Sequence, residues 1–312
     1  LQTESPWGAN TIPLRFRASQ LDADELSDKA LQNRIGPAQE YYVALSAKAK
    51  ALYALPDSVS EMQWTSKGYA RGNGQYLFTR AQQVVERCVQ NSKGERPIYF
   101  AVTCGYPTSE MYCGLGAYCR QEGMVYRVCP QRVGEPGEVI NEKAMEQHLL
   151  NTRTAERVAL NAAPGFIMRN LNNEGVYYNE TERRYVDNYR TLYIRAAQHC
   201  IQRGDSLKAQ RYLHAMNETI SMKIFPMSYA LMSSVAEFSE QTGDHEMVKR
   251  FDEEIVRQCD ALLQQPFLQK QVEVFIQDSP PAIVAAQSCL RLKRFDEALR
   301  YVVVAEQTLT SP

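Results

Sequence analysis

The second half of the chain repeats one pattern of small and large apolar positions three times. When the segments 200–213, 239–252 and 289–302 are aligned without gaps, a small residue is followed three positions later by an aromatic ring in every copy. A further alanine lies three positions before each segment. A small side chain on each of two helices lets them cross closely, and a ring one turn later fills the space beside the contact. The coincident positions are Ala197, Ala236 and Ala286; Ala209, Val248 and Ala298; and Tyr212, Phe251 and Tyr301.

This pattern is typical of stacked helical hairpins and resembles the tetratricopeptide repeat. The shared small position moves from residue 209 to 248 and then 298, so the hairpins are longer than the consensus repeat of roughly 34 residues. Gly204 and Gly243 fall where the turns between paired helices are expected, whereas Lys293 takes that place in the third copy. We therefore expect tetratricopeptide-like helical repeats over residues 187–312. The alternative is three unrelated amphipathic hairpins.

The pattern in the first half predicts a small α/β module over residues 1–140. An amphipathic helix is expected from Thr79 to Gly94. The apolar runs 98–104 and 124–129 predict two strands, and a helix is expected between them at 110–121. Strand, helix and strand in this order predict a βαβ unit with parallel strands and a right-handed crossover. The apolar stripe of the first helix is expected to be Ala81, Val84, Val85, Cys88 and Val89.

Weaker patterns complete the expected organisation. Residues 13–17 read as an edge strand, 37–55 as a helix and 66–75 as a long loop rich in glycine and aromatic residues. Residues 141–186 form the expected helical connector, with a helix over 141–162. The predicted fold is therefore α+β/α, a small α/β module followed by a helical hairpin array.

One loop of the α/β module is a candidate ligand site. It follows the carboxyl end of the first predicted strand and precedes a predicted helix, which is where open α/β sheets bind ligands and where free amides favour anions. The loop lacks a glycine-rich phosphate pattern, so an ordinary capped turn is the alternative. Together with nearby tyrosines it would form a carbohydrate site made of Tyr99, Gly105, Tyr106, Thr108, Ser109 and Tyr126.

The repeat resemblance predicts a second candidate site in the helical array. If the hairpins stack as tetratricopeptide repeats do, certain first-helix positions line an inner groove. This surface is rich in amides, mildly acidic and without the basic clamp that would hold a carboxyl terminus. It suits hydrogen bonding to a peptide backbone or to sugar hydroxyls, and an ordinary solvated helix face is the alternative. The expected groove residues are Gln198, Gln202, Glu237, Glu240, Gln241, Gln287 and Arg291.

Composition excludes several classes of partner. The chain has 312 residues, 44% of them hydrophobic, which suits about two globular domains. Its 35 basic and 36 acidic residues are well mixed and give a net charge of −1, so a nucleic-acid partner is not expected. No apolar run approaches the roughly 18 residues of a membrane span. Because the chain begins at Leu1 and not at methionine, we expect a processed protein or an excised piece of a longer one.

Chemistry-bearing motifs are scarce. The eight cysteines show no C-x-x-C or zinc spacing, so neither a metal nor a cofactor is predicted, although Cys104 and Cys129 would be neighbours at the ends of the two predicted strands. The four histidines form no H-x-x-x-H or H-E-x-x-H motif, and no G-x-S-x-G sequence occurs. The acidic cluster at 22–25 suits a helix amino end better than a glycosidase pair. No catalytic residue is predicted, and a hydrolase or transferase without a known signature is the third hypothesis.

Several segments, taken in order, resemble one family. They are QYLFTRAQQVVERCVQNSKGERPIYFA (75–101), GLGAYCRQEGMVYRVCP (114–130) and NYRTLYIRAAQHCIQRGDSLKAQRYL (188–213). They look like the C-terminal soluble part of a Bacteroidota family of multi-spanning membrane proteins of unknown function, related to protein O-mannosyltransferases. The most specific part is RPIYFA followed by EGMVYRVCP, and the resemblance covers roughly residues 75–260.

The resemblance implies an accessory role for this chain. In that family an amino-terminal membrane region carries glycosyltransferase-like chemistry that uses a lipid-phosphate sugar, and this sequence does not contain it. The chain would be a non-catalytic domain at the periplasmic face of the membrane, joined to the membrane through an anchor region outside this sequence. Its partner would be another protein or a polypeptide substrate. The alternative is a carbohydrate-recognising module of the same system, acting on a glycan or glycoprotein.

Overall fold

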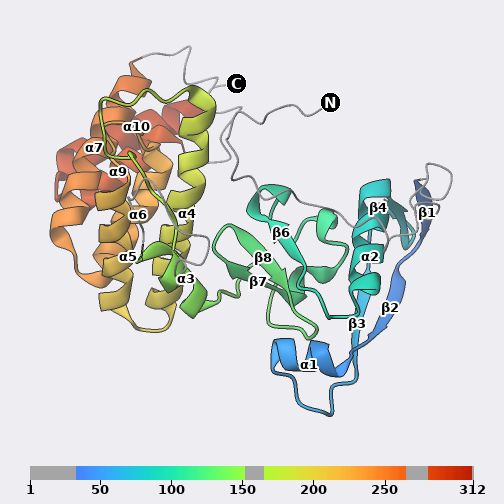
Figure 1. Ribbon diagram of the computed structural model, residues 1–312. Helices are drawn as coiled ribbons and strands as arrows, with labels where there is room; N and C mark the ends of the chain where they lie inside the picture. Colours follow the sequence, from blue (N-terminus) through green and yellow to red (C-terminus); the bar gives the residue numbers. More distant parts are fainter. Residues whose placement is uncertain (1–32, 152–164, 265–279, 311–312) are drawn as a thin grey trace, which may run out of the picture. The chain divides into compact units, whose positions relative to one another are not determined.

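The computed structural model describes residues 33–151, 165–264 and 280–310, with side chains described as far as residue 306. The predicted strand at 13–17, the acidic cluster at 22–25 and the end of the predicted connector helix lie outside these ranges. The chain divides into two compact units, one within Leu1–Gln121 and Val125–Val139, the other comprising Glu122–Met124 and Ile140–Pro312. Helices and small sheets are both present, which gives an α+β class (Figure 1).

The described strands of the first unit form three small sheets (Figure 1). The first has the order β1 (Arg34–Pro37), β5 (Gln75–Phe78), β4 (Tyr69–Gly72). The second pairs β2 (Gln39–Ala44) with β3 (Glu61–Ser66), and the third has the order β6 (Tyr99–Ala101), β8 (Val125–Val128), β7 (Cys119–Glu122). The pairs β1/β5, β2/β3, β4/β5 and β6/β8 are all antiparallel.

The helix predicted over 37–55 is wrong in its first half. The segment 39–44 is strand β2, whose side chains alternate between exposed and more buried positions. It pairs along its whole length with β3, and Tyr41 stacks on the fully buried Trp64 with ring centroids 4.8 Å apart. The helix begins only at α1 (Ala47–Tyr53), where the Ser46 side chain accepts a hydrogen bond from the Ala49 amide. This alternation of burial is that of a half-buried strand, although the sequence QEYYVA does not itself alternate between polar and apolar residues.

The long loop predicted over 66–75 is also wrong, because it contains the β4–β5 hairpin. Gly72 lies opposite Gln75, so Asn73 and Gly74 form a two-residue turn, and both have positive φ angles of 51° and 70°. A two-residue hairpin of this kind requires positive φ at both central positions, for which Asn-Gly is the preferred sequence. The glycines that suggested a loop are those that make the tight turn.

The predicted βαβ unit is contradicted by the structure. Strand β6 pairs with β8 antiparallel, with Tyr99 opposite Arg127, and no α-helix forms over 110–121. That segment has 3₁₀ helices at Glu110–Tyr112 and Leu115–Tyr118, followed by β7. Gly114 between them has a φ of 79°, and the carbonyl oxygen of Thr65 lies 2.0 Å from where its Cβ would be. The close approach of the β3 backbone therefore fixes a turn where the sequence suggested a helix.

The helix predicted over 79–94 is confirmed as α2 (Arg80–Ser92), but the expected apolar stripe makes up only part of its buried face: Val89 is buried and Val85 packs against the core. Thr79 and Gln82 form a capping box at its start. Its buried residues are Gln82, Gln83, Glu86 and Val89, whereas Ala81 is exposed. Glu86 accepts hydrogen bonds from the Tyr41 hydroxyl at 2.8 Å and the Ser66 hydroxyl at 2.5 Å. Burial and this contact with Glu86 raise the pKa of Tyr41 above its ordinary value.

The described part of the second unit is built from helices (Figure 1). Its helices are α3 (Glu142–Leu149), α4 (Glu180–Gln202), α5 (Ser206–Thr219), α6 (Tyr229–Thr242), α7 (His245–Leu263), α9 (Pro281–Arg291) and α10 (Phe295–Thr310). Helices α4 and α5, α6 and α7, and α9 and α10 pack as pairs joined by short turns. All nine coincident positions of the sequence pattern are buried in these helices.

The three short turns between paired helices share one backbone conformation. Gly204, Gly243 and Lys293 have φ angles of 78°, 79° and 60°, all in the left-handed region. Asp205 and Asp244 then cap α5 and α7 through their side chains. The turn positions expected from the sequence are confirmed, and Lys293 adopts a conformation that glycine takes at lower cost.

Candidate functional site

The first helices of the three pairs carry polar side chains in two matching columns. Helix α4 contacts α6, and α6 contacts α9, so these three helices follow one another in space. Aligned on Ala197, Ala236 and Ala286, one column contains Gln198, Glu237 and Gln287, and the column one turn later contains Gln202, Gln241 and Arg291. Because side chains four residues apart lie on the same face of a helix, the two columns belong to one surface.

Most of these expected groove residues are exposed. Gln198, Gln202, Glu237, Glu240, Gln241 and Gln287 all have exposed side chains. On α6 the Gln241 amide donates to the Glu237 carboxylate at 3.3 Å. The surface is therefore a row of amides, which donate and accept hydrogen bonds, and of carboxylates, which accept them, and none of these residues carries a ring.

Arg291 differs from the other expected groove residues because it is tied to a buried carboxylate. Its Nε donates to Oδ2 of Asp252 at 2.9 Å and its Nη2 to Oδ1 at 2.6 Å, which links α9 to α7. Burial would lower the pKa of Arg291, but the hydrogen bonds and charge of Asp252, with the charges of Glu237 and Glu240, raise it. The structure thus brings Glu237, Glu240 and Arg291 within electrostatic reach of one another.

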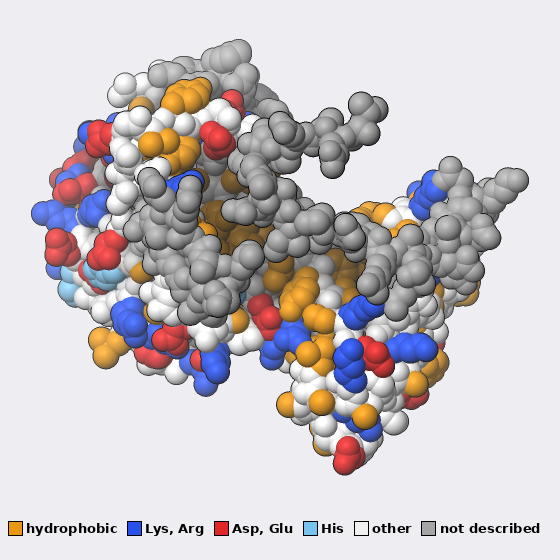
Figure 2. Space-filling view, viewed as in Figure 1, with side chains coloured by type: hydrophobic (Ala, Val, Ile, Leu, Met, Phe, Trp, Pro, Cys, Tyr) orange, Lys and Arg blue, Asp and Glu red, His pale blue; other side chains and the backbone are white. Residues whose placement is uncertain are grey.

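The charge balance of this surface follows from that ion pair. Asp252 is fully buried and neutralises Arg291, so the guanidinium is not free to hold an anionic ligand. Glu237 and Glu240 then leave the surface acidic, as the sequence indicated. Figure 2 shows acidic and basic side chains interspersed over the visible face of the helical unit, with no large area of one sign. Such a surface does not attract phosphate-rich ligands.

The alternative ligand loop has a different geometry from the expected one. The helix that follows it is a 3₁₀ helix of three residues, so it supplies no row of free amides. The Ser109 hydroxyl already accepts the Met111 amide, and the Gly105 carbonyl accepts the Tyr112 hydroxyl at 2.9 Å. Tyr126 is buried in the core and meets Tyr112 edge-on. The expected anion site at a helix amino end is therefore absent from this loop.

Four members of that expected loop site are still exposed, Gly105 among them. Tyr99 and Tyr106 have about half of their surface exposed, at 46% and 50%, and Thr108 is exposed as well. Tyrosine rings exposed on a surface are suited to stacking on sugar rings. The alternative hypothesis, carbohydrate binding, therefore depends on the rings of Tyr99 and Tyr106.

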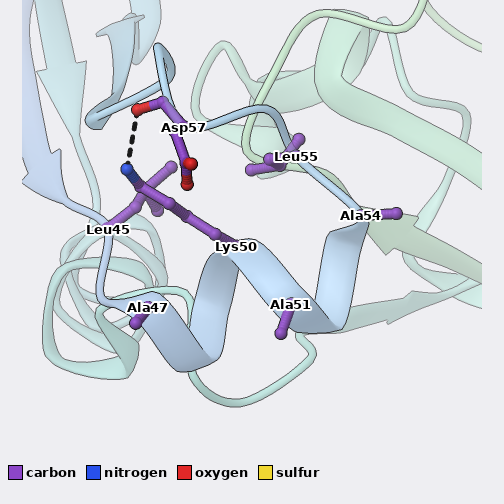
Figure 3. Close-up of a pocket in the computed structure, with 7 residues that line it drawn as sticks. All are labelled: Leu45, Ala47, Lys50, Ala51, Ala54, Leu55 and Asp57. Carbon is purple, nitrogen blue, oxygen red and sulfur yellow. Dashed lines mark hydrogen bonds between the residues drawn. The ribbon is translucent and has the colours of Figure 1, made fainter.

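A surface pocket that the sequence did not indicate lies beside α1. It measures about 420 Å³ and is lined by Leu45, Ala47, Lys50, Ala51, Ala54, Leu55 and Asp57. Figure 3 shows the Lys50 side chain reaching from α1 to the following loop, where Nζ donates to the Asp57 carbonyl at 2.9 Å. The lining is mostly alanine and leucine. The positive charge of Lys50 is held by a backbone carbonyl. The pocket offers apolar surface without a set of reactive groups.

A second pocket of about 610 Å³ lies between the segment before α6 and helix α7. Arg257 and Glu254 on α7 form a two-point ion pair, with Nε at 2.7 Å and Nη2 at 2.5 Å from the carboxylate. Gln258 donates to the Met227 carbonyl at 3.2 Å. The i,i+3 spacing of Glu254 and Arg257 was the available sequence signal, but it indicates a helix-surface pair and not a pocket.

Two of the four histidines lie against carboxylates, and no metal-binding group forms in the described part of the chain. Within the described residues, no three His, Cys, Asp or Glu side chains form a group that would hold a metal ion. His199 lies 3.0 Å from Glu142, and His214 lies 2.7 Å from Asp244. All eight cysteines are free thiols, with Cys104 exposed and Cys129 buried.

Comparison of the chain with protein-family models, curated proteins and solved structures gives no match. Among the helices of the described ranges, none combines the length and apolar character needed to cross a bilayer. The site must therefore be interpreted from its own geometry.

Proposed function

We propose that this chain is a non-catalytic interaction domain whose tetratricopeptide-like helical unit binds an extended polypeptide across α4, α6 and α9. The observation that carries this proposal is the pair of polar columns on three successive first helices, Gln198, Glu237 and Gln287 with Gln202 and Gln241. Amide side chains both donate and accept, which matches the alternating donors and acceptors of a peptide backbone.

The spacing of packed helices suits an extended chain. Neighbouring helix axes lie about 8–10 Å apart, and an extended peptide rises about 3.3 Å per residue. A peptide that crosses the three helices would therefore meet a new pair of polar side chains every three residues or so. Because the carboxylates of Glu237 and Glu240 are exposed on this surface while Arg291 is held by Asp252, it favours neutral or basic peptides over acidic ones.

The wider setting of the proposal comes from the sequence resemblance of segments 75–101, 114–130 and 188–213. On that basis the chain is an extracytoplasmic domain, at the periplasmic face, of a glycosyltransferase-like membrane protein related to protein O-mannosyltransferases. A polypeptide-binding surface suits such a system, since its acceptor is itself a polypeptide. The membrane contact would be made by an anchor region outside this sequence.

The test is peptide binding with a matched pair of surface variants. Fluorescent peptides of about 12 residues, long enough to cross three helices, would be titrated in neutral, basic and acidic sets. Gln198→Ala with Glu237→Ala should weaken binding of the neutral and basic sets by roughly tenfold or more. Glu218→Ala with Glu246→Ala, on the second helices α5 and α7, should leave binding unchanged. Equal affinities for both variants would reject this surface as the binding site.

Carbohydrate recognition is the second candidate, favoured by the half-exposed rings of Tyr99 and Tyr106. Calorimetric titration with mannosides would then show saturable binding that Tyr99→Ala with Tyr106→Ala abolishes and Tyr177→Ala preserves. No heat of binding would exclude this reading for those sugars. Turnover of a glycosyl donor or glycoside by this chain alone would contradict both candidates.

A further inference from the structure

The first-helix surface, formed by the two polar columns of α4, α6 and α9, contains one side chain that is fixed in advance. Arg291 shares its column with Gln202 and Gln241. Its Nε and Nη2 donate to Asp252 at 2.9 Å and 2.6 Å, and Nη2 also donates to the Ser288 hydroxyl at 3.2 Å. Only 14% of the Arg291 side chain is exposed. The guanidinium is therefore in place before a ligand arrives, so its use as a donor costs little side-chain entropy.

One nitrogen of this guanidinium, Nη1, is not used by the ion pair. A guanidinium is planar, and Nε and Nη2 form the edge that faces Asp252, so Nη1 lies on the opposite side of the group. Among the described residues Nη1 has no hydrogen-bond partner, and it is not enclosed in the way that Nε of Arg190 is. The two N–H groups of Nη1 are thus available at the surface.

The charges around Arg291 decide which acceptor it can take. Asp252 neutralises the guanidinium, and the carboxylates of Glu237 and Glu240 on α6 lie close enough for their charges to act on it. An anionic acceptor at Nη1 would therefore meet one positive charge and three negative ones, which disfavours it. The acceptor that fits is a neutral oxygen, as in a peptide carbonyl.

We propose that Arg291 is a peptide-binding residue of the first-helix surface, where Nη1 donates to a backbone carbonyl of an internal segment of the polypeptide. This inference rests on the proposed function, since it concerns the same surface. A free carboxyl terminus carries a negative charge, and the surroundings of Arg291 exclude it. The ligand class is therefore a stretch within a polypeptide chain and not its end.

Asp252 is a positioning residue in this arrangement, because it holds the guanidinium and is itself completely buried. It occupies the place that the apolar Leu213 has on α5. Replacing both members of a buried ion pair by apolar residues of similar volume is often neutral or stabilising, whereas removing one member leaves an unpaired buried charge. Asp252→Leu with Arg291→Met therefore removes the donor and keeps the fold.

Titration of the neutral peptide set with this double variant tests the role of Arg291. Asp252→Leu with Arg291→Met should weaken binding by roughly tenfold, the loss expected for one hydrogen bond from a charged donor. Glu254→Ala with Arg257→Ala removes an ion pair from the surface of α7 and should bind as wild type does. Far-UV circular dichroism and thermal melting show whether each variant is folded. Arg291→Lys, which keeps a charge beside Asp252 but lacks Nη1, replaces the double variant if that one is not.

Two changes to the peptide identify the group that Arg291 contacts. The free-acid and amide-capped forms of one neutral peptide should bind alike, because the terminus makes no contact with Arg291. Replacing single backbone amides by esters makes the carbonyl a weaker acceptor. One ester position should reduce the affinity for wild type and leave the affinity for the double variant unchanged, which is the coupling expected of two groups in contact.

The outcomes separate this inference from the proposed function. If Gln198→Ala with Glu237→Ala weakens binding and the folded Arg291 variant does not, the surface binds peptide without Arg291 and this inference alone is overturned. Binding that requires a free carboxyl terminus overturns it as well. If no peptide set binds to the wild-type chain, the proposed function and this inference are both wrong.

Discussion

Arg291 of α9 binds both carboxylate oxygens of Asp252 of α7, at 2.9 Å and 2.6 Å. Asp252 is completely buried, and it occupies a position where α5 has the apolar Leu213. The Arg291 guanidinium also donates to the Ser288 hydroxyl at 3.2 Å. The last described helix pair is thus joined to the preceding one by a buried ion pair in addition to apolar packing.

Breaking this ion pair should destabilise the helical unit strongly. Asp252→Ala leaves the Arg291 guanidinium without its partner in a mostly buried place, so we expect a loss of about 3–5 kcal/mol in the free energy of unfolding. Glu254→Ala removes an ion pair on the surface of the same helix and should have a much smaller effect. Urea unfolding followed by circular dichroism measures both, and equal effects would show that Asp252 contributes only as a surface charge does.

Replacing Lys293 by glycine should stabilise the chain. Lys293 has a φ of 60° in a turn where the other two pairs have Gly204 and Gly243. A non-glycine residue in this region costs about 1–2 kcal/mol, and glycine costs roughly 0.5–1 kcal/mol in backbone entropy, so a net gain of about 0.5–1 kcal/mol is expected. Gly243→Ala, where nothing lies near the added Cβ, should cost about 1 kcal/mol. A loss of thermal stability in Lys293→Gly would contradict the argument.

Gly114→Ala should be far more damaging than Gly74→Ala. Both glycines have similar positive φ angles, 79° and 70°, so the backbone strain of alanine is similar. A Cβ at Gly114 would lie 2.0 Å from the Thr65 carbonyl oxygen, whereas one at Gly74 meets nothing within 4 Å. We expect about 1 kcal/mol for Gly74→Ala and 3 kcal/mol or more for Gly114→Ala. Trp64, buried beside this turn, reports the unfolding by fluorescence, and similar midpoints would disprove the close contact.

Stability should fall above pH 9 because buried thiols resist ionisation. Burial, with a smaller effect of the Glu86 charge, raises the pKa of Cys113 to about 12 from an ordinary value of 9.0. Between these values the unfolded chain has released the thiol proton and the folded chain has kept it, so rising pH favours unfolding. The thiol should cost roughly 1–2 kcal/mol at pH 10.5.

The measurement compares unfolding free energies at pH 8 and pH 10.5. Cys113→Ala should show a shallower decline than wild type, since it lacks that proton. Cys104→Ser changes an exposed thiol and should decline as wild type does. An identical slope in all three proteins would mean that Cys113 ionises normally in the folded chain.

The local sequence predicted much of the helical unit. Small residues at 197, 236 and 286 and rings at 212, 251 and 301 identified the pairs, and all of these positions are buried. Helices are formed by contacts three and four residues apart, so a short stretch of sequence contains the information that specifies them. The exposed polar positions of the first helices followed from the same register.

Predictions made from the sequence were wrong where the residues that contact each other are far apart in the chain. Residues 39–44 read as part of a helix because their strand partner, 61–66, lies beyond a helix and a turn. The predicted stripe of α2 was incomplete for the same reason: it left out Glu86, which is buried where the hydroxyls of Tyr41 and Ser66 donate to it from two strands. When residues distant in the chain supply hydrogen-bond partners, the polar face of a helix can be the one that is buried.

The sequence by itself determined where the turns between paired helices lie, which small and aromatic side chains are buried in the pairs and, Arg291 excepted, which polar groups of the first helices face outwards. Only the tertiary structure decided that β6 and β8 are antiparallel, that Asp252 takes an apolar position and holds Arg291, and that Phe295 and Leu299 of α10 stay exposed. The physical reason is the range of the interactions: helical periodicity is local, whereas strand pairing, buried charge and surface exposure depend on residues that the chain brings together from far apart.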